Sequence, residues 1–326
     1  MSILQAIILG IVQGLTEFIP VSSTAHLIFA GRALNLYDGI EQTLRAERTT
    51  ASIAVIQLGT LVAVLLYFAR DIWAISHAFL RDHLALLKGK RPSSALGAKA
   101  GEAVRSGLSP EAWLGWLIII GSLPVGIIGL LFKKQIEGTF TKNLWVIATM
   151  MIAVAILLAI AEKVGAQRRG MKNLGVADAL AVGGAQVLAL VPGASRSGST
   201  IMGGLFAGET RETAARFSFL LSIPAIAASG LLELKEAVTK LPPDSYVSLA
   251  VATVVAGIVG YATIWFLLRF LRTHSTGIFI GYRLVVGTII LALLFAGRLS
   301  PLDNSPAHAR NNANSLSLTG AVHLAR

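Results

Sequence analysis

Long apolar runs dominate this sequence and limit the folds that it can adopt. A helix needs about 20 mostly apolar residues to cross the hydrocarbon core of a bilayer. Charged residues make up 14% of the chain, against about 25% in a typical soluble domain. The sequence therefore predicts an all-α, polytopic helical membrane protein. Its six expected spanning helices are 52–69, 113–132, 143–161, 213–233, 247–268 and 277–297.

Cysteine usage and charge exclude several classes of site. The chain has no cysteine, which excludes disulfides and cysteine-ligated zinc or iron–sulfur centres. Its net charge of +11 arises mainly from Lys and Arg between the apolar runs, so we expect no nucleic-acid partner. The loops fall into two alternating sets, of which one holds 13 Lys and Arg residues in total and the other holds 7. The richer loops, 70–112, 162–173 and 269–276, are assigned to the cytoplasm, which leaves both termini outside. No charge precedes Glu17, so we expect no cleaved signal peptide.

Two further apolar stretches, 3–34 and 176–208, are interrupted near their middles. The interruptions are Pro20 in the first and Pro192-Gly193 in the second. Proline removes a backbone donor and ends or kinks a helix, and each half is too short to span a bilayer alone. We expect two re-entrant helical hairpins, although two ordinary kinked spanning helices would also fit this pattern.

The two interrupted stretches are related by an offset of 173 residues. Three expected spans follow each copy, so the second copy enters the membrane from the opposite side, which is typical of an inverted-topology repeat. We expect a single membrane domain over 1–298, with repeats at about 3–161 and 176–297, and a disordered tail over 299–326. The aligned pairs are Ala6 and Ala179, Gly10 and Gly183, Gln13 and Gln186, Leu15 and Leu188, Ser22 and Ser195, and Gly31 and Gly204.

Polar residues follow both breakers and favour an anionic ligand. Ser22 in the first copy, and Ser195 or Ser197 in the second, are suited to cap the next helix. A helix N-terminus offers unpaired N–H groups and a partial positive charge to an anion. Arg196 adds a planar guanidinium that suits phosphate oxygens. The implied ligand is a phosphate or diphosphate.

Glu17, Ser23 and His26 are the candidates for chemistry. A carboxylate at membrane depth is expensive and is a functional candidate by default, although Glu17 could also serve only as an ion-pair partner of Arg196. His26 could likewise be a polar residue satisfied inside the bundle. Ser23 could attack as a nucleophile, or water could attack with His26 or Glu17 as base. The sequence leaves both routes open.

Glu17 and Gln13 lie four residues apart, on one helical face. Their oxygen atoms suit a hard divalent cation such as Mg²⁺ or Ca²⁺, which commonly bridges to substrate phosphate. The sequence therefore predicts a cation that is shared between this face and the ligand.

Other polar residues are weaker candidates. Residues 81–112 are expected to form a solvated, partly helical loop without assigned chemistry. A charged junction beyond the second hairpin is expected from Glu209, Arg211, Glu212 and Arg216. The expected substrate-binding residues are Ser22, Thr24, Gly193, Ser195, Ser197, Thr200, Arg283 and Gln57.

The two broken motifs resemble a known family. QGLTEFIPVSSTAH (13–26) and PGASRSGST (192–200), in this order and spacing, resemble the undecaprenyl-diphosphate phosphatase family of the bacitracin-resistance type. The similarity runs from about residue 4 to 297. It includes VIQLGTLVAV (55–64), FSFLLSIP (217–224) and the YR at 282–283.

The resemblance implies a bacterial inner-membrane enzyme that removes the terminal phosphate from a C55 prenyl diphosphate. This reaction recycles the lipid carrier for cell-wall synthesis and confers bacitracin resistance. The resemblance also implies metal dependence, a site open to the outer face, and a membrane lipid as substrate. It assigns Glu17 to an acidic motif, Ser23 and His26 to a catalytic turn, and Arg196 to phosphate binding. Gln13 departs from the pattern, because many members have a second Glu there.

Two alternatives compete with this interpretation. A prenyl-phosphate flippase or anion transporter would also use an inverted repeat with broken helices, but it has little need for Glu17 and His26. The other common class of lipid phosphatase uses two histidines and an aspartate in three motifs, which this chain lacks. The sequence leaves the oligomeric state open, and a homodimer is one option.

Overall fold

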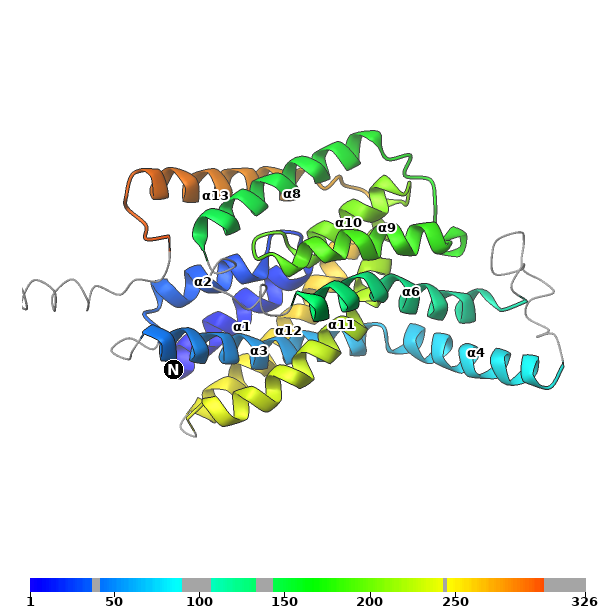
Figure 1. Ribbon diagram of the computed structural model, residues 1–326, viewed down its shortest axis with the longest axis horizontal. Coiled ribbons are helices and arrows are strands. Elements are labelled where there is room, and N and C mark those ends of the chain that lie inside the picture. The colour runs from blue at the N-terminus through cyan, green and yellow to red at the C-terminus, as the bar shows by residue number, and fades with distance from the viewer. Residues whose placement is uncertain (37–41, 90–106, 133–142, 243–244, 302–326) are drawn as a thin grey trace, which may run out of the picture.

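The computed structural model describes residues 1–36, 42–89, 107–132, 143–242 and 245–301. Within these ranges the helices are joined by turns and short irregular segments, with one isolated bridge between Arg169 and Glu209. The helices form one bundle (Figure 1). In chain order they are α1 Ile3–Phe18, α2 Ser23–Ala33, α3 Gln42–Tyr67, α4 Ala69–Leu87, α6 Pro110–Leu131, α8 Leu144–Val164, η3 Met171–Asn173, α9 Val176–Val187, η4 Leu188–Leu190, α10 Arg196–Phe206, α11 Arg211–Lys240, α12 Tyr246–Leu271 and α13 Gly277–Phe295.

The all-α, polytopic membrane fold is confirmed. Five described helices are long and apolar enough to cross a bilayer: Arg48–Tyr67 within α3, α6, α8, α12 and α13. The helix α11 lies where the sixth span was expected, but it is not among these five. The count of six spans therefore stays a prediction.

The expected loop over 81–112 is partly helical, as predicted, because its start belongs to a longer regular helix. Residues 69–87 form α4, in which Asp82 is buried and accepts from the backbone N–H of Ser109 over 2.8 Å. Ser109 in turn caps α6 through its hydroxyl. The extent of this helix was not predicted, because the charged side chains of Arg81, Asp82 and His83 resemble those of a solvated loop. Residues 90–106 of that loop lie outside the described residues.

Both interrupted stretches fold back as hairpins. Helix α1 has 16 residues and α2 has 11, so each falls short of a bilayer span. Gln5, near the start of α1, donates to the carbonyl of Leu34 at the end of α2 over 2.9 Å. Arg169 makes the equivalent link in the second hairpin, where it joins Asp178 of α9 to the carbonyl of Ala207 after α10. Both stretches are therefore helical hairpins rather than single kinked helices, and their re-entry into the membrane stays a prediction.

The two hairpins pack in a reciprocal way. Helix α1 packs against α12, and α9 packs against α6 (Figure 1). A Cβ at Gly10 of α1 would lie 2.5 Å from the Ala252 oxygen of α12, and one at Gly183 of α9 would lie 2.1 Å from the Gly121 oxygen of α6. These aligned glycines are therefore needed for close backbone approach, as expected for membrane helices. The match supports the predicted repeat, whose opposite membrane orientations stay a prediction.

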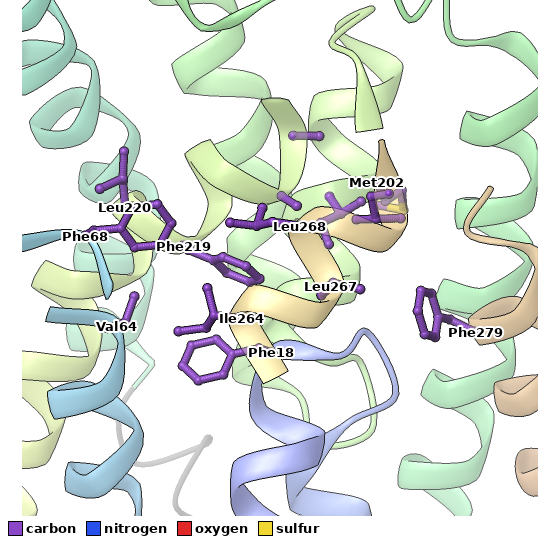
Figure 2. Packing of buried hydrophobic residues seen from close by; sticks show 14 of the residues in the cluster. Phe18, Val64, Phe68, Met202, Phe219, Leu220, Ile264, Leu267, Leu268 and Phe279 are labelled. Atoms are coloured by element: carbon purple, nitrogen blue, oxygen red, sulfur yellow. The ribbon is translucent and has the colours of Figure 1, made fainter. Parts of the chain in front are cut away.

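An apolar cluster holds the end of α1 in place. Phe18 is fully buried and meets Phe219 of α11 edge to face, with ring centroids 5.3 Å apart. Ile264 of α12 and Val64 of α3 belong to the same cluster (Figure 2). Because Phe18 directly follows Glu17, this packing fixes the backbone that carries the carboxylate.

The expected tail starts later than the sequence suggested. Leu299 packs on the cluster between α8 and α13, and the Pro301 carbonyl accepts from the first N–H of α8 over 2.9 Å. Residues 299–301 are therefore part of the fold, which corrects the boundary. The rest of the expected tail, 302–326, lies outside the described residues.

Candidate active site

The breaks in the two hairpins share an unusual backbone conformation. Ser22 and Ser195, which the offset aligns, precede α2 and α10 with φ of 78° and 69°. Positive φ is uncommon for a residue with a side chain, and such strain gathers at functional sites. Each strained serine stands directly before a helix N-terminus, where unpaired N–H groups favour an anion.

Arg283 of α13 connects the two breaks. Its fully buried guanidinium donates to the carbonyl of Pro20 in the first turn over 3.2 Å. It also donates to the carbonyls of Gly193 and Ala194 in the second turn, over 3.0 and 2.9 Å. Two further carbonyls, from α8, complete its contacts at 3.1 and 3.3 Å. One cation thus ties both turns together, and its expected contact with phosphate stays a prediction.

The two serines do not cap their helices in the same way. Ser195 caps α10 as expected, because its hydroxyl accepts from the N–H of Gly198 over 3.1 Å. Ser22 makes no side-chain cap on α2, so that expectation is wrong. Its ψ is 93°, against 119° at Ser195, and its carbonyl accepts from the Nδ1 of His26 instead.

Glu17 is the centre of a network that joins both hairpins. The residue is 6% exposed. Its Oε1 accepts from Nη2 of Arg196 over 2.8 Å, and its Oε2 accepts from the hydroxyl of Ser23 over 2.9 Å. The amide of Gln13 also donates to Oε2, over 3.0 Å. The structure therefore brings together three of the four predicted catalytic residues, which lie at the end of α1 and the starts of α2 and α10.

One guanidinium nitrogen of Arg196 is placed to bind a ligand. While Nη2 holds Glu17, Nη1 is buried and has no hydrogen-bond partner among the described residues. A buried donor without a partner costs about 1–3 kcal/mol, which an anionic oxygen would relieve. The fork geometry of guanidinium suits carboxylate on one side and phosphate on the other.

Gln13 shows how far the site fits a divalent cation. Its Oε1 is buried and lacks a partner among the described residues, beside the carboxylate of Glu17. Groups of three or more His, Asp or Glu that could hold a metal are absent from the described residues. The oxygens of Gln13 and Glu17 therefore fit a hard cation that takes its remaining ligands from substrate phosphate and water.

His26 lies beside this network rather than within it. Its Nδ1 is 2.7 Å from the carbonyl of Ser22, and its Nε2 is 2.6 Å from the hydroxyl of Tyr282. The hydrogen bonds of His26 do not include Glu17 in the described structure. His26 therefore contacts the turn only through the carbonyl of Ser22, which directly precedes Ser23, and its catalytic role stays a prediction.

Three further expected ligand residues, Gly193, Ser197 and Thr200, lie in the second hairpin and have different contacts. The hydroxyl of Ser197 donates to the carbonyl of Ile19 over 3.2 Å and so links the hairpins. Thr200 donates to the carbonyl of Arg196 within its own helix. Gly193 needs a glycine, since its φ is 94° and a Cβ would lie 2.2 Å from the Ile147 oxygen.

Two expected ligand residues have weaker links to the site. Thr24 lies in the first turn of α2 and is partly exposed. Gln57 lies on α3, where its carbonyl accepts from the hydroxyl of Thr60. The substrate contacts of Thr24 and Gln57 stay predictions.

Sequence reasoning missed two residues of this region. The buried Thr60 lies 3.4 Å from the Gln13 amide. A signal was available, because Thr60 lies one turn after Gln57 on an apolar helix. Tyr282 contacts His26 across 256 positions of sequence, and its neighbour Arg283 was the signal that could have pointed to it.

The expected charged junction exists but is spread over several helices. Arg211 pairs with Glu162 of α8, and Arg216 pairs with Asp71 of α4 over 2.7 Å. Glu212 pairs with Arg272, which follows α12, over 2.7 Å. Glu209 is different: it is fully buried, and neither carboxylate oxygen has a hydrogen-bond partner among the described residues.

Comparison with known proteins places the chain in a family. A family model described as bacitracin resistance protein BacA matches residues 6–289. Three similar proteins are each named undecaprenyl-diphosphatase. The one from Syntrophobacter fumaroxidans is 50% identical over 90% of this chain and 98% of its own length. The one from Chlorobium limicola is 46% identical over 92% and 99%, and the one from Mycolicibacterium vanbaalenii is 46% identical over 93% and 100%.

The family match covers both hairpins and the network between them. It begins in α1 and ends within α13, so it includes Glu17, Ser23, His26 and Arg196. The chain therefore belongs to the family of the bacitracin resistance protein BacA.

Proposed function

We propose that this protein hydrolyses undecaprenyl diphosphate to undecaprenyl phosphate and inorganic phosphate. The reaction recycles the lipid carrier for cell-wall synthesis and gives bacitracin resistance. The observation that carries the proposal is Arg196, whose Nη2 holds Glu17 while the buried Nη1 has no partner among the described residues. Nη1 can therefore donate to a phosphate oxygen while Glu17 holds both Nη2 and the hydroxyl of Ser23.

Ser23 is the nucleophile in this proposal. Its hydroxyl already donates to Glu17 over 2.9 Å, the arrangement of a nucleophile beside its base. Ser23 Oγ attacks the terminal phosphorus, its proton passes to Glu17, and the bond to the bridging oxygen breaks. Undecaprenyl phosphate leaves, and water then attacks the phosphoserine. The bond from Ser23 Oγ to phosphorus breaks, Ser23 takes back the proton from Glu17, and inorganic phosphate is released. His26 takes the proton of that water.

Arg196 and the two helix N-termini stabilise the charge that develops on the terminal phosphoryl oxygens. Preorganised donors of this kind contribute about 10²–10³-fold each.

A divalent cation completes the proposal. Glu17 and Gln13 would hold it, because the buried Oε1 of Gln13 has no other partner among the described residues. When bound, the cation would neutralise charge on the diphosphate.

The location of the site follows from the substrate. The C55 tail cannot leave the bilayer, so the diphosphate must be met at the membrane by a multi-pass protein. We assign the enzyme to the bacterial inner membrane with its site open to the outer face, as the resemblance to its family implies. A homodimer stays a prediction.

Phosphate release tests this function directly. We expect the purified protein to release phosphate from a C15 or C55 prenyl diphosphate, to lose activity in EDTA, and to recover it with Mg²⁺ or Ca²⁺. Glu17→Gln and Arg196→Ala should each lower kcat at least ~10²-fold, the low end for a base or an oxyanion contact. Glu111→Gln, at an exposed carboxylate in the first turn of α6, is the matched control and should match wild type.

The same assay separates the alternatives. If Ser23→Ala retains the wild-type rate, water attacks directly and the serine route is wrong. Wild type that releases no phosphate but moves prenyl phosphate across vesicles would support a carrier and contradict the hydrolase.

A further inference from the structure

Both ring nitrogens of His26 have a hydrogen-bond partner in this structure. The partner of Nε2 lies outside the network around Glu17. Nδ1 lies 2.7 Å from the Ser22 carbonyl and Nε2 lies 2.6 Å from the Tyr282 hydroxyl. The two rings are nearly parallel, with an interplanar angle of 16° and centroids 5.6 Å apart. His26 belongs to the first hairpin, and Tyr282 belongs to α13.

The partner of each nitrogen sets the tautomer of the ring. A carbonyl oxygen can only accept a hydrogen bond, so the proton of neutral His26 must sit on Nδ1. The lone pair is then on Nε2, where the Tyr282 hydroxyl donates to it. Nε2 can therefore take a proton only once the Tyr282 hydroxyl releases its lone pair, and until then Tyr282 fixes where that lone pair points.

The backbone of Tyr282 is held by its neighbour. Arg283 is fully buried and bonded to the carbonyls of both hairpin turns. The side chain of Tyr282 is itself 44% exposed. Its position relative to the turn is thus set by the Arg283 anchor on one side and by the hydrogen bond to His26 on the other.

We propose that Tyr282 is a positioning residue for His26 in the hydrolysis reaction. Its hydroxyl holds Nε2, keeps the proton on Nδ1 and fixes the ring beside the Ser22–Ser23 turn. The proposal rests on the function proposed above, since it gives His26 a role in proton transfer. It assigns no contact between Tyr282 and the substrate.

Tyr282→Phe tests the proposal, because it removes the hydroxyl and keeps the ring. Tyr261→Phe is the matched control: Tyr261 is 47% exposed, lies on α12, and makes a ring contact with Tyr67 rather than with a histidine. We expect kcat for phosphate release to fall about tenfold in Tyr282→Phe, since loss of an orienting partner typically costs about 10–100-fold. KM should change less than twofold, and Tyr261→Phe should leave both constants unchanged.

A second readout does not depend on activity. The chain has 6 histidines, so ¹⁵N-labelled imidazoles of the full protein in nanodiscs can be resolved by NMR, with His26→Gln to assign the signal. Wild type should show His26 as a single tautomer protonated at Nδ1. Tyr282→Phe should show a mixture of tautomers or a mobile ring, whereas Tyr261→Phe should leave the signal unchanged.

Several results would overturn the proposal. An unchanged kcat in Tyr282→Phe would show that Tyr282 does not position His26 for the reaction. A raised kcat would mean that Tyr282 blocks His26 instead of positioning it. A change in KM alone would make Tyr282 a substrate contact. An unchanged tautomer signal would show that the hydroxyl does not hold the ring. If the tautomer shifts as expected but His26→Gln keeps full activity, the contact is real and the proposed role of His26 in hydrolysis has failed.

Discussion

Glu209 shows, at the scale of a single residue, how one buried carboxylate makes stability depend on pH. It lies between α10 and α11, fully buried, and neither carboxylate oxygen has a partner among the described residues. Burial raises its pKa from 4.5 to about 8, and the neighbouring charge of Asp178 adds to this effect. The 173-residue offset aligns it with Leu36, which is also buried and makes the same backbone hydrogen bond to an aligned glycine. One repeat thus places an acid where the other places an apolar side chain.

We expect the pH dependence of unfolding to change in Glu209→Gln. Because the folded pKa is raised, the folded protein holds this proton more tightly than the unfolded chain does. That contribution to stability is fully present below pH 4.5 and is lost as the pH rises through about 8. Within this window wild type should lose up to about 1.4 kcal/mol per pH unit from this group.

Thermal unfolding in detergent at pH 5, 7 and 9 measures this effect. Glu209→Gln should gain stability relative to wild type as the pH rises, and the exposed Glu111→Gln should show no such trend. Parallel pH profiles for wild type and Glu209→Gln would mean that the carboxyl does not hold its proton in the folded protein.

At the scale of secondary-structure elements, the site depends on the way two helical hairpins and α13 are joined. The first turn belongs to α1 and α2, the second to α9 and α10, and α13 supplies the guanidinium that bonds to both. Five backbone carbonyls accept from Arg283. Carbonyls exposed by a proline or glycine break need such a donor at membrane depth, since water is scarce there.

Arg283→Lys should therefore destabilise the protein and disable the site together. An ammonium group cannot reach five carbonyls placed around a planar guanidinium, and each carbonyl left unsatisfied costs about 1–3 kcal/mol. We expect a loss of about 3 kcal/mol or more in unfolding free energy and a large loss of phosphate release. Arg269→Lys, at an exposed arginine near the end of α12, is the control and should behave as wild type. An Arg283→Lys variant with wild-type melting and activity would show that the turns hold together without this residue.

The elements that sequence reasoning predicted are those with local signals. Pro20 and Pro192 break apolar runs, and Glu17 and Arg196 stand out within them, so both hairpins and the centre of the site could be predicted. The missing cap at Ser22, the Thr60 contact and the link from Tyr282 to His26 depend on packing between distant segments, which no local pattern records. The extent of helix α4 was not predicted for a local reason, because its charged side chains resemble those of a loop.

At the scale of the whole molecule, the fold brings two distant chain segments to one point. Helix α1 packs on α12 and α9 packs on α6, so each hairpin rests on a helix of the other half (Figure 1). Glu17 and Arg196 are separated by 179 positions of sequence, yet Oε1 of Glu17 lies 2.8 Å from Nη2 of Arg196. The proposed diphosphate site needs both halves to meet in this way within one chain.

The meeting of the two turns can be measured by cross-linking, because the chain contains no cysteine. The Ser197 hydroxyl lies 3.2 Å from the Ile19 carbonyl, and a disulfide needs Cα atoms about 4.4–6.8 Å apart. We would oxidise the double variant Ile19→Cys with Ser197→Cys at low concentration and identify the cross-link by mass spectrometry. Ile11→Cys with Ser197→Cys is the control, since Ile11 is exposed and lies two turns earlier on α1. We predict a disulfide within one chain for the first pair and none for the control. A folded double variant that stays reduced, or that links only between chains, would contradict the central claim that the two hairpin turns form one site.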